Sequence, residues 1–319
     1  MKGLPQLALC FAFTVITALS AATIYRGLST NAVVQAAVGI QDPSQQPYQG
    51  PPDQGPDPAA VNQAQAPPDQ GVAPSGQSYT TQAPPPPDQN PEDYNNAEQP
   101  AATAPQPPPP LPDYDQPPPP ADGYMWTPGY WAWGPSGYYW VPGAWIEPPY
   151  AGALWTPGYW AFYSGRYLFY PGHWGTHIGF YGGINYGFGY VGFGYEGGYW
   201  NAGRFFYNRA YNRIDARVVH NVYSYHANVH INQGIRQSYR GGPQGVQVHP
   251  QPSERAAWRE PYAPRMNTQV AHEKSYGSVR EQYANQNHGR PPSTTVNRPL
   301  TADRNVKPQS HESHDKERH

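Results

Sequence analysis

The hexapeptide WTPGYW at residues 126–131 recurs as WVPGAW at 140–145, as WTPGYW at 155–160 and as FYPGHW at 169–174. Successive copies begin 14 or 15 residues apart, and the first and third are identical. The true period is therefore a pair of copies, 29 residues long. Self-similarity at a fixed period of this size is typical of a repeated structural unit.

Each copy has a Pro-Gly pair at its centre. Proline presets the backbone angle of the second position of a type II turn, and glycine accepts the positive φ of the third. The pattern therefore predicts a tight turn in every copy, with each of these glycines at positive φ. The residues expected to form these turns are Pro128, Gly129, Pro142, Gly143, Pro157, Gly158, Pro171 and Gly172.

Two further turns are expected between the copies, at GPSG (134–137) and at YSGR (163–166). Turns about every seven residues, separated by aromatic stretches, predict a meander of very short β-strands over residues 123–174. In that register Trp126 faces Trp131, Trp131 faces Trp140, and Trp140 faces Trp145. The second unit follows the same pattern, and the inner pairs are Trp133 with Tyr138 and Phe162 with Tyr167.

The meander would place the aromatic residues of each unit in one row, where cross-strand pairs contribute about 0.2–1 kcal/mol each. A contiguous apolar surface of this size is seldom left unused. Either the rows pack into an aromatic core, or one row stays open and binds a ligand such as a glycan. About fifty residues form a marginal core without a disulfide or metal, which favours the first interpretation. The candidate residues are Trp126, Trp131, Trp140, Trp145, Trp155, Trp160, Phe169 and Trp174.

The flanks predict a chain that is mostly disordered around this small all-β region. Residues 23–122, rich in Pro, Gln and Asp, predict a disordered spacer with polyproline II character, or a proline-rich ligand for a partner domain. Residues 175–232 are rich in Gly and Tyr, and alternation over 219–231 predicts a half-buried strand. Residues 233–319 predict a basic disordered tail.

The charges of the two flanks are opposite in sign. Residues 41–122 hold eleven acidic residues and no Lys or Arg, whereas residues 203–319 hold seventeen Lys or Arg and nine acidic residues. The flanks can therefore attract each other or different partners. Because acidic residues dilute the basic flank, nucleic acid is not an expected partner.

The first 22 residues predict a signal peptide. Lys2 supplies the positive charge, residues 4–19 are mostly apolar, and small residues allow cleavage after Ser20 or Ala22. An uncleaved anchor is the alternative, because the apolar stretch can extend to Ile24. Cleavage would remove Cys10, the only cysteine, and leave no stable membrane span and no disulfide.

Catalytic and cofactor motifs are weak throughout, so we predict no enzyme activity, no cofactor and no metal site. The pattern GxGxxG fits residues 187–192 and 192–197, but no helix-forming stretch follows to bind a pyrophosphate. The acidic residues Glu147, Glu196 and Asp215 are far apart in sequence. A glycosidase-type site needs two close carboxyl groups, and although Glu147 with Glu196 is conceivable, nothing specific supports that pair. The histidines at 220, 226 and 230, at 173 and 177, and at 311, 314 and 319 do not make a tetrahedral set.

The four hexapeptides, behind an apolar N-terminus and a Pro-rich segment, resemble the bacterial WXXGXW (YXWGXW) repeat family over about residues 123–232. Phe169 in place of the first Trp is a mild departure. The resemblance implies an exported envelope protein, in the periplasm, at the outer membrane or outside the cell, with no assigned enzyme activity or ligand. We expect a structural or interaction protein whose partner is an envelope protein or polysaccharide. A glycan-binding module with exposed Trp and Tyr platforms is the alternative, and an enzyme with an unrecognised site is a weaker one.

Overall fold

A computed structural model describes residues 55–65, 100–227 and 236–309, which all belong to one compact unit, Pro47–His319. The expected signal peptide and much of the expected spacer lie outside the described residues. Among the residues described, no helix is both long and apolar enough to cross a bilayer.

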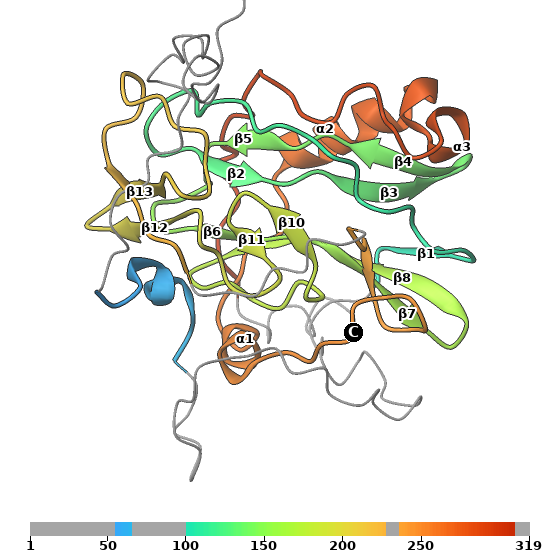
Figure 1. Ribbon diagram of the computed structural model, residues 1–319, viewed down its shortest axis with the longest axis horizontal. Coiled ribbons are helices and arrows are strands. Elements are labelled where there is room, and N and C mark those ends of the chain that lie inside the picture. The colour runs from blue at the N-terminus through green and yellow to red at the C-terminus, as the bar shows by residue number, and fades with distance from the viewer. Residues whose placement is uncertain (1–54, 66–99, 228–235, 310–319) are drawn as a thin grey trace, which may run out of the picture. The chain divides into compact units, whose positions relative to one another are not determined.

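Each 29-residue unit folds as one long hairpin whose two arms are interrupted at the same level (Figure 1). In the first unit, β3 (Tyr130–Gly134) and β4 (Gly137–Val141) form the inner ladder. The outer ladder pairs β2 (Met125–Thr127) with β5 (Ala144–Ile146). The expected turn at residues 134–137 is confirmed, because it joins the two inner strands.

The second unit repeats this arrangement. Its inner ladder pairs β7 (Tyr159–Tyr163) with β8 (Arg166–Tyr170), and its outer ladder pairs β6 (Leu154–Thr156) with β9 (His173–Gly175). The expected turn at residues 163–166 is also confirmed. Ser164 and Gly165 both have positive φ there, as a two-residue hairpin turn of type I′ requires.

The predicted register is right for the inner strands and wrong for the outer ones. Trp131 lies opposite Trp140 and Trp133 opposite Tyr138, as expected, but Trp126 lies opposite Trp145 instead of Trp131. Trp155 likewise lies opposite Trp174. The repeats are therefore two nested hairpins and not a four-stranded meander.

The error arises at the Pro-Gly pairs, which do not reverse the chain. None of Gly129, Gly143, Gly158 and Gly172 is among the residues with positive φ, so the type II turns are wrong. Proline lacks an N–H and interrupts the ladder, and glycine then lets the opposite arm approach closely. A Cβ on Gly143 would lie 2.7 Å from Cζ2 of Trp126 and 2.9 Å from the backbone N of Gly129. The eight residues expected to form turns therefore form two kinks, one in each hairpin. At each kink the two Pro-Gly pairs of the hairpin lie opposite each other, and the two arms are in contact.

The two hairpins pack against each other through their aromatic residues. The Trp160 ring N–H donates to the Trp131 carbonyl oxygen over 2.7 Å, and the Tyr138 and Trp160 rings meet edge to face at 5.1 Å. Tyr130 stacks on Phe169 with 5.5 Å between ring centroids. The core of the molecule therefore lies between the two repeat units.

The Gly-rich region covers one side of this core. Its short strands are β10 (Asn185–Gly187), β11 (Tyr190–Val191), β12 (Gly198–Asn201), β13 (Arg204–Asn208) and β14 (Val222–Tyr223). Tyr190 is fully buried and donates its hydroxyl to the Trp155 carbonyl oxygen at 2.8 Å. Closely spaced glycines allow this approach because they have no side chains.

The predicted strand over residues 219–231 is too long, since within 219–227 only Val222–Tyr223 is strand. The strand ends at Tyr223 because, at Tyr225, the side chain of Asn208 takes the place of the backbone groups of a neighbouring strand. The Asn208 amide bonds both the N–H and the carbonyl oxygen of Tyr225, at 3.1 and 2.9 Å. Residues 228–231 lie outside the described part of the chain.

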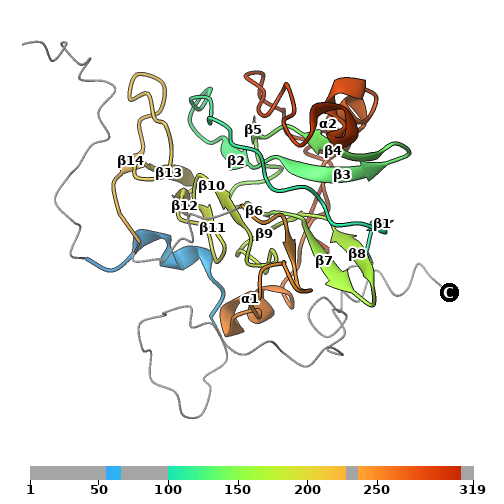
Figure 2. The ribbon, with the colours of Figure 1, turned by 45° about the vertical axis from the view of Figure 1, so that its right-hand side comes forward.

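Both flanks contain ordered elements where none was expected. The N-terminal flank contributes the 3-10 helix η2 (Pro58–Asn62) and β1 (Ala102–Ala104), which pairs with β8. The C-terminal flank contributes β15 (Tyr239–Arg240), α1 (Pro252–Ala257), α2 (Asn267–Gly277), η4 (Arg280–Gln282) and α3 (Ala284–Asn287). Figure 2 shows α2 lying against the β3–β4 hairpin. Disorder is thus wrong for residues 100–122 and 236–309, because backbone pairing, polar contacts and single buried side chains such as Leu111 and Met266 replace the apolar periodicity that the sequence lacks.

Candidate functional site

The eight aromatic residues of the repeats are all buried, each with 5% or less of its surface exposed. Opposite residues are in ring contact, with centroids 5.5 Å apart for Trp126 and Trp145 and 5.1 Å for Trp155 and Trp174. Their faces are covered by other side chains and are not available to stack on a sugar in this conformation.

The ring N–H groups of four of these tryptophans, Trp131, Trp140, Trp145 and Trp174, bind the flanks. The N–H of Trp131 donates to the Pro110 carbonyl oxygen at 3.1 Å and that of Trp145 to the Pro117 carbonyl oxygen at 2.6 Å. Trp140 donates to the Thr294 carbonyl oxygen at 3.0 Å. Because a buried indole N–H without an acceptor is costly, these bonds couple the repeats to segments far away in sequence.

The open edges of the hairpins are covered in a similar way. The tail runs parallel to β5, where the Leu300 N–H donates to the Trp145 carbonyl oxygen at 2.9 Å. On the other unit, Trp174 and Ala263 exchange two backbone hydrogen bonds of 2.8 and 2.7 Å. Covering an edge with another segment of chain is how sheets avoid unpaired N–H and carbonyl groups.

Residues 105–120, here called the proline strap, lie extended across the repeats. In this strap Pro108, Leu111 and Tyr114 recur every third residue, and all three are buried or half-buried. A period of three is that of polyproline II, which has no internal hydrogen bonds and presents its carbonyl oxygens to outside donors. Several of the strap's carbonyl oxygens accept such bonds, including that of Gln106 from the Tyr138 hydroxyl at 2.8 Å.

Tyr114 anchors the strap. Its ring lies 6.1 Å from that of Trp140 and 5.4 Å from that of Phe188, and its hydroxyl donates to the Tyr186 carbonyl oxygen at 2.7 Å. Burial raises the pKa of Tyr114 to about 12, although nearby Arg236 opposes the shift. The hydroxyl therefore remains a neutral donor at physiological pH.

Arg236 binds the strap from the other flank. Its guanidinium donates to the Pro112 carbonyl oxygen at 2.7 Å, lies 5.2 Å from the centre of the Tyr114 ring, and is 3.8 Å from the Asp113 carboxylate. A backbone bond from the Leu111 N–H to the Arg236 carbonyl oxygen, 2.8 Å long, fixes the register. The Arg236–Asp113 pair joins the acidic flank to the basic one, but the Asp113 carboxylate is fully exposed, so the pair contributes little to stability.

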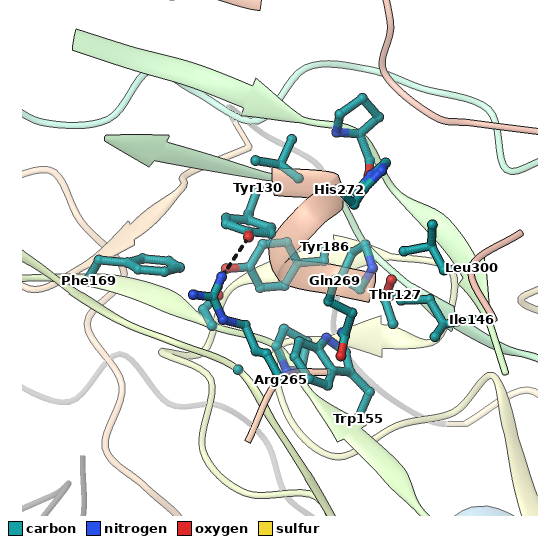
Figure 3. A pocket seen from close by; sticks show the side chains of 16 residues that line it. Thr127, Tyr130, Ile146, Trp155, Phe169, Tyr186, Arg265, Gln269, His272 and Leu300 are labelled. Carbon is teal, nitrogen blue, oxygen red and sulfur yellow. Dashed lines mark hydrogen bonds between the residues drawn. The ribbon is translucent and has the colours of Figure 1, made fainter. Parts of the chain in front are cut away.

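A second concave feature lies between the two kinks, beneath α2 (Figure 3). Its empty space, mouth included, is about 500 Å³, and its lining includes Pro128, Pro142, Pro157 and Gly172. The Tyr130 hydroxyl donates to Glu273 at 2.6 Å, and Arg265 contacts both residues.

The polar groups of this pocket are already paired. Trp174 donates to Gln269 at 2.9 Å, and the His272 ring meets the Pro142 carbonyl oxygen at 2.9 Å. Burial lowers the pKa of His272, so its neutral form is favoured. We therefore assign the pocket a role in holding α2 and assign it no ligand.

The remaining candidate groups are dispersed. Glu147 pairs with Arg304 at 2.6 Å and Asp215 with Arg217 at 2.8 Å, whereas Glu196 is buried beside Asp57. His220 pairs with Asp122 at 2.8 Å. In the described part of the chain, no three His, Cys, Asp or Glu side chains are grouped to hold a metal ion. The C-terminal histidines lie outside that part.

The Gly-rich GxGxxG stretches are filled by the protein itself. Gly187, Gly189, Gly192 and Gly194 have positive φ, and the loop wraps around Tyr181. The Tyr181 hydroxyl donates to the Gly194 carbonyl oxygen at 2.9 Å and accepts from the Gly192 N–H at 3.1 Å. Of the backbone N–H groups that would cradle a phosphate, that of Gly192 is thus engaged with Tyr181, and that of Gly187 donates to the Asn185 side chain at 3.0 Å.

Comparison with known families identifies the same two repeat units. The WXXGXW repeat model matches two copies, at residues 122–145 and 154–174. The chain carries two WXXGXW repeats. Each copy corresponds to one nested hairpin, so the repeat is a structural unit with one kink, at which its two Pro-Gly pairs lie opposite each other. No curated protein and no solved structure matches the chain.

The repeat pattern predicts the aromatic residues of this site but not their partners. Tyr114, Arg236 and the strap carbonyl oxygens were missed, because the Pro-rich segment was interpreted chiefly as a spacer. One signal was available: an Asp-Tyr-Asp sequence at 113–115 stands between two runs of four prolines. An isolated large aromatic residue in such a segment can act as an anchor.

Proposed function

We propose that the protein is an exported, non-enzymatic structural or interaction protein of the bacterial cell envelope, in which the paired WXXGXW hairpins hold extended peptide segments. One observation carries the proposal. Ring N–H groups of Trp131, Trp140 and Trp145 point outward from the aromatic core to backbone carbonyl oxygens of extended chain. Backbone oxygens are present in any polypeptide, so this arrangement suits a scaffold for protein segments.

Export is tested by the mass of the mature chain. The protein is expressed in a Gram-negative host, the envelope and cytoplasmic fractions are separated, and intact mass is measured. We expect an envelope-associated chain that begins at Ala21 or at Thr23. Recovery of the full chain with Met1 from the cytoplasm would reject the envelope assignment, and a full-length chain in the membrane fraction would indicate an anchor.

The glycan-binding alternative is tested by retention on purified peptidoglycan and envelope polysaccharide. Because the eight aromatic faces are buried, we expect neither retention of the folded protein nor a change in its Trp fluorescence. A matched control uses Trp133→Ala, because this half-buried ring lies outside the eight. Saturable retention that is lost in folded Trp133→Ala would favour a glycan platform at a site other than the rows.

A further inference from the structure

The proline strap has the features of a bound peptide. Within the strap there is no hydrogen bond of a helix or strand, and several of its carbonyl oxygens accept from side-chain donors on other segments. The side chains of Leu111, Tyr114 and Gln116 are turned toward the protein, whereas those of Asp113 and Asp115 are exposed. Proline-rich ligands are bound in this way in aromatic-lined grooves, where the preformed polyproline II shape keeps the entropy cost low.

The surface that holds the strap, here called the groove, includes Trp126, Trp140, Phe188 and Arg236, and it contacts residues other than proline. Tyr114 fills a position among Trp126, Trp140 and Phe188, and Arg236 lies over its ring and beside Asp113. Gln116, which is 1% exposed, donates to the Asn212 side chain at 2.9 Å and accepts from the Arg213 N–H at 3.2 Å. The groove therefore holds the Tyr114 and Gln116 side chains in fixed positions within a proline-rich segment, while the exposed Asp113 carboxylate stands 3.8 Å from Arg236.

The strap is joined to the hairpins by a short hinge, residues 121–124. Gly123 adopts a positive φ of 86°, and a Cβ there would meet nothing within 4 Å. Its neighbours are held: the buried Tyr207 hydroxyl lies 3.2 Å from the Ala121 carbonyl oxygen and 2.8 Å from that of Tyr124, and Asp122 pairs with His220. Once these bonds open, rotation about Gly123 is enough to detach the strap and offer it to another molecule.

We propose, resting on the function above, that this groove is a binding site for the proline strap of a second copy of the chain. In the structure the groove holds its own strap. Exchange between copies would recreate every one of these contacts, since the two straps have the same sequence, and would link copies without a new interface. The acidic strap and Arg236 of the basic flank make the exchange complementary in charge.

The test is a competition in the full-length mature protein. The probe is a fluorescent peptide of residues 104–121, and Tyr114→Ala in the protein weakens the internal strap. Wild-type protein has its strap at high effective concentration and should bind the probe poorly. We expect Tyr114→Ala to bind it at least tenfold more tightly than wild type. A peptide that carries Tyr114→Ala should bind at least tenfold more weakly than the wild-type peptide.

Two controls keep the result interpretable. Arg236→Gln added to Tyr114→Ala should lower the affinity for the probe, whereas Arg217→Gln, on an exposed pair, should not. If Tyr114→Ala is unfolded by circular dichroism, wild-type chains labelled with ¹⁴N and ¹⁵N are mixed at high concentration instead. Native mass spectrometry should then show mixed dimers, fewer of them when excess peptide is present.

Folded Tyr114→Ala that does not bind the probe at millimolar concentration would overturn the proposal, as would the absence of mixed dimers in the mass-spectrometric version. Either result leaves the envelope assignment intact if the protein is still exported. Cytoplasmic retention would reject that assignment even if the peptide binds.

Discussion

Gly143→Ala tests the finding that the Pro-Gly pairs are sites of close approach and not turns. The added methyl would lie 2.7 Å from Cζ2 and 3.0 Å from Cη2 of Trp126, and 2.9 Å from the backbone N of Gly129. Ordinary carbon contacts are about 3.5–4.0 Å, so the ring and the opposite arm must both move. Overpacking of a buried site costs about 1–3 kcal/mol. For a domain of this size, 1 kcal/mol lowers the melting temperature by about 2–4 °C.

The matched control is Gly152→Ala, in the loop between the two units. Gly152 has a φ of 87° and nothing within 4 Å of a built Cβ, so alanine there meets strain but no crowding, worth about 1 kcal/mol. Urea unfolding followed by Trp fluorescence compares the two. We expect Gly143→Ala to cost clearly more, and Trp126→Phe to recover part of that cost in the double variant. Equal costs, or no recovery, would refute the close-approach explanation.

Three further predictions concern other parts of the molecule. Burial and the Asp57 carboxyl raise the pKa of Glu196 to about 8, so folding favours the protonated acid. Stability should therefore fall as pH rises from about 4.5 to about 8, by up to ~1.4 kcal/mol per pH unit, and Glu196→Gln should flatten this slope in pH-dependent urea titrations. Gln282, fully buried, donates to the Trp140 and Ser293 carbonyl oxygens, so Gln282→Ala should cost about 2–4 kcal/mol, whereas exposed Gln286→Ala should cost less than about 0.5 by the same assay. Trp emission should be blue-shifted and resistant to acrylamide, and strong quenching in the native protein would contradict the buried rows.

The inner half of each hairpin could be predicted from the sequence because its turns are unambiguous. Residues 134–137 and 163–166 reverse the chain, and the pairs Trp131–Trp140 and Trp160–Phe169 follow. The outer half was missed because a Pro-Gly pair fits a type II turn and an extended kink equally well. Symmetry distinguishes the two: the pairs at 128–129 and 142–143 are equally far from the turn at 135–136, as opposite arms of one hairpin require.

The flanks could not be predicted by the same reasoning, since periodicity detects elements that bury an apolar face. Helix α2 has no such face and is held by single polar contacts, including those of Gln269 with Trp174 and of Glu273 with Tyr130. Apart from the Leu111 and Tyr114 side chains, the strap likewise contacts the repeats through backbone oxygens, which every sequence has. Only the partners' positions reveal such contacts.

This dependence on backbone oxygens determines what the smallest stable unit can be. Residues 123–174 alone would keep the ring N–H groups of Trp131, Trp140, Trp145 and Trp174 but lose all four acceptors, which lie on the two flanks. Water reaches these donors once the flanks are gone, so the loss is that of the four bonds, about 0.5–1.5 kcal/mol each, against a whole stability of about 5–15 kcal/mol for an ordinary domain. The isolated repeats would also expose the edges of β5 and β9, which now pair with the tail. The WXXGXW repeats therefore fold as the centre of a larger unit, to which an acidic strap on one side and a basic tail on the other contribute structure.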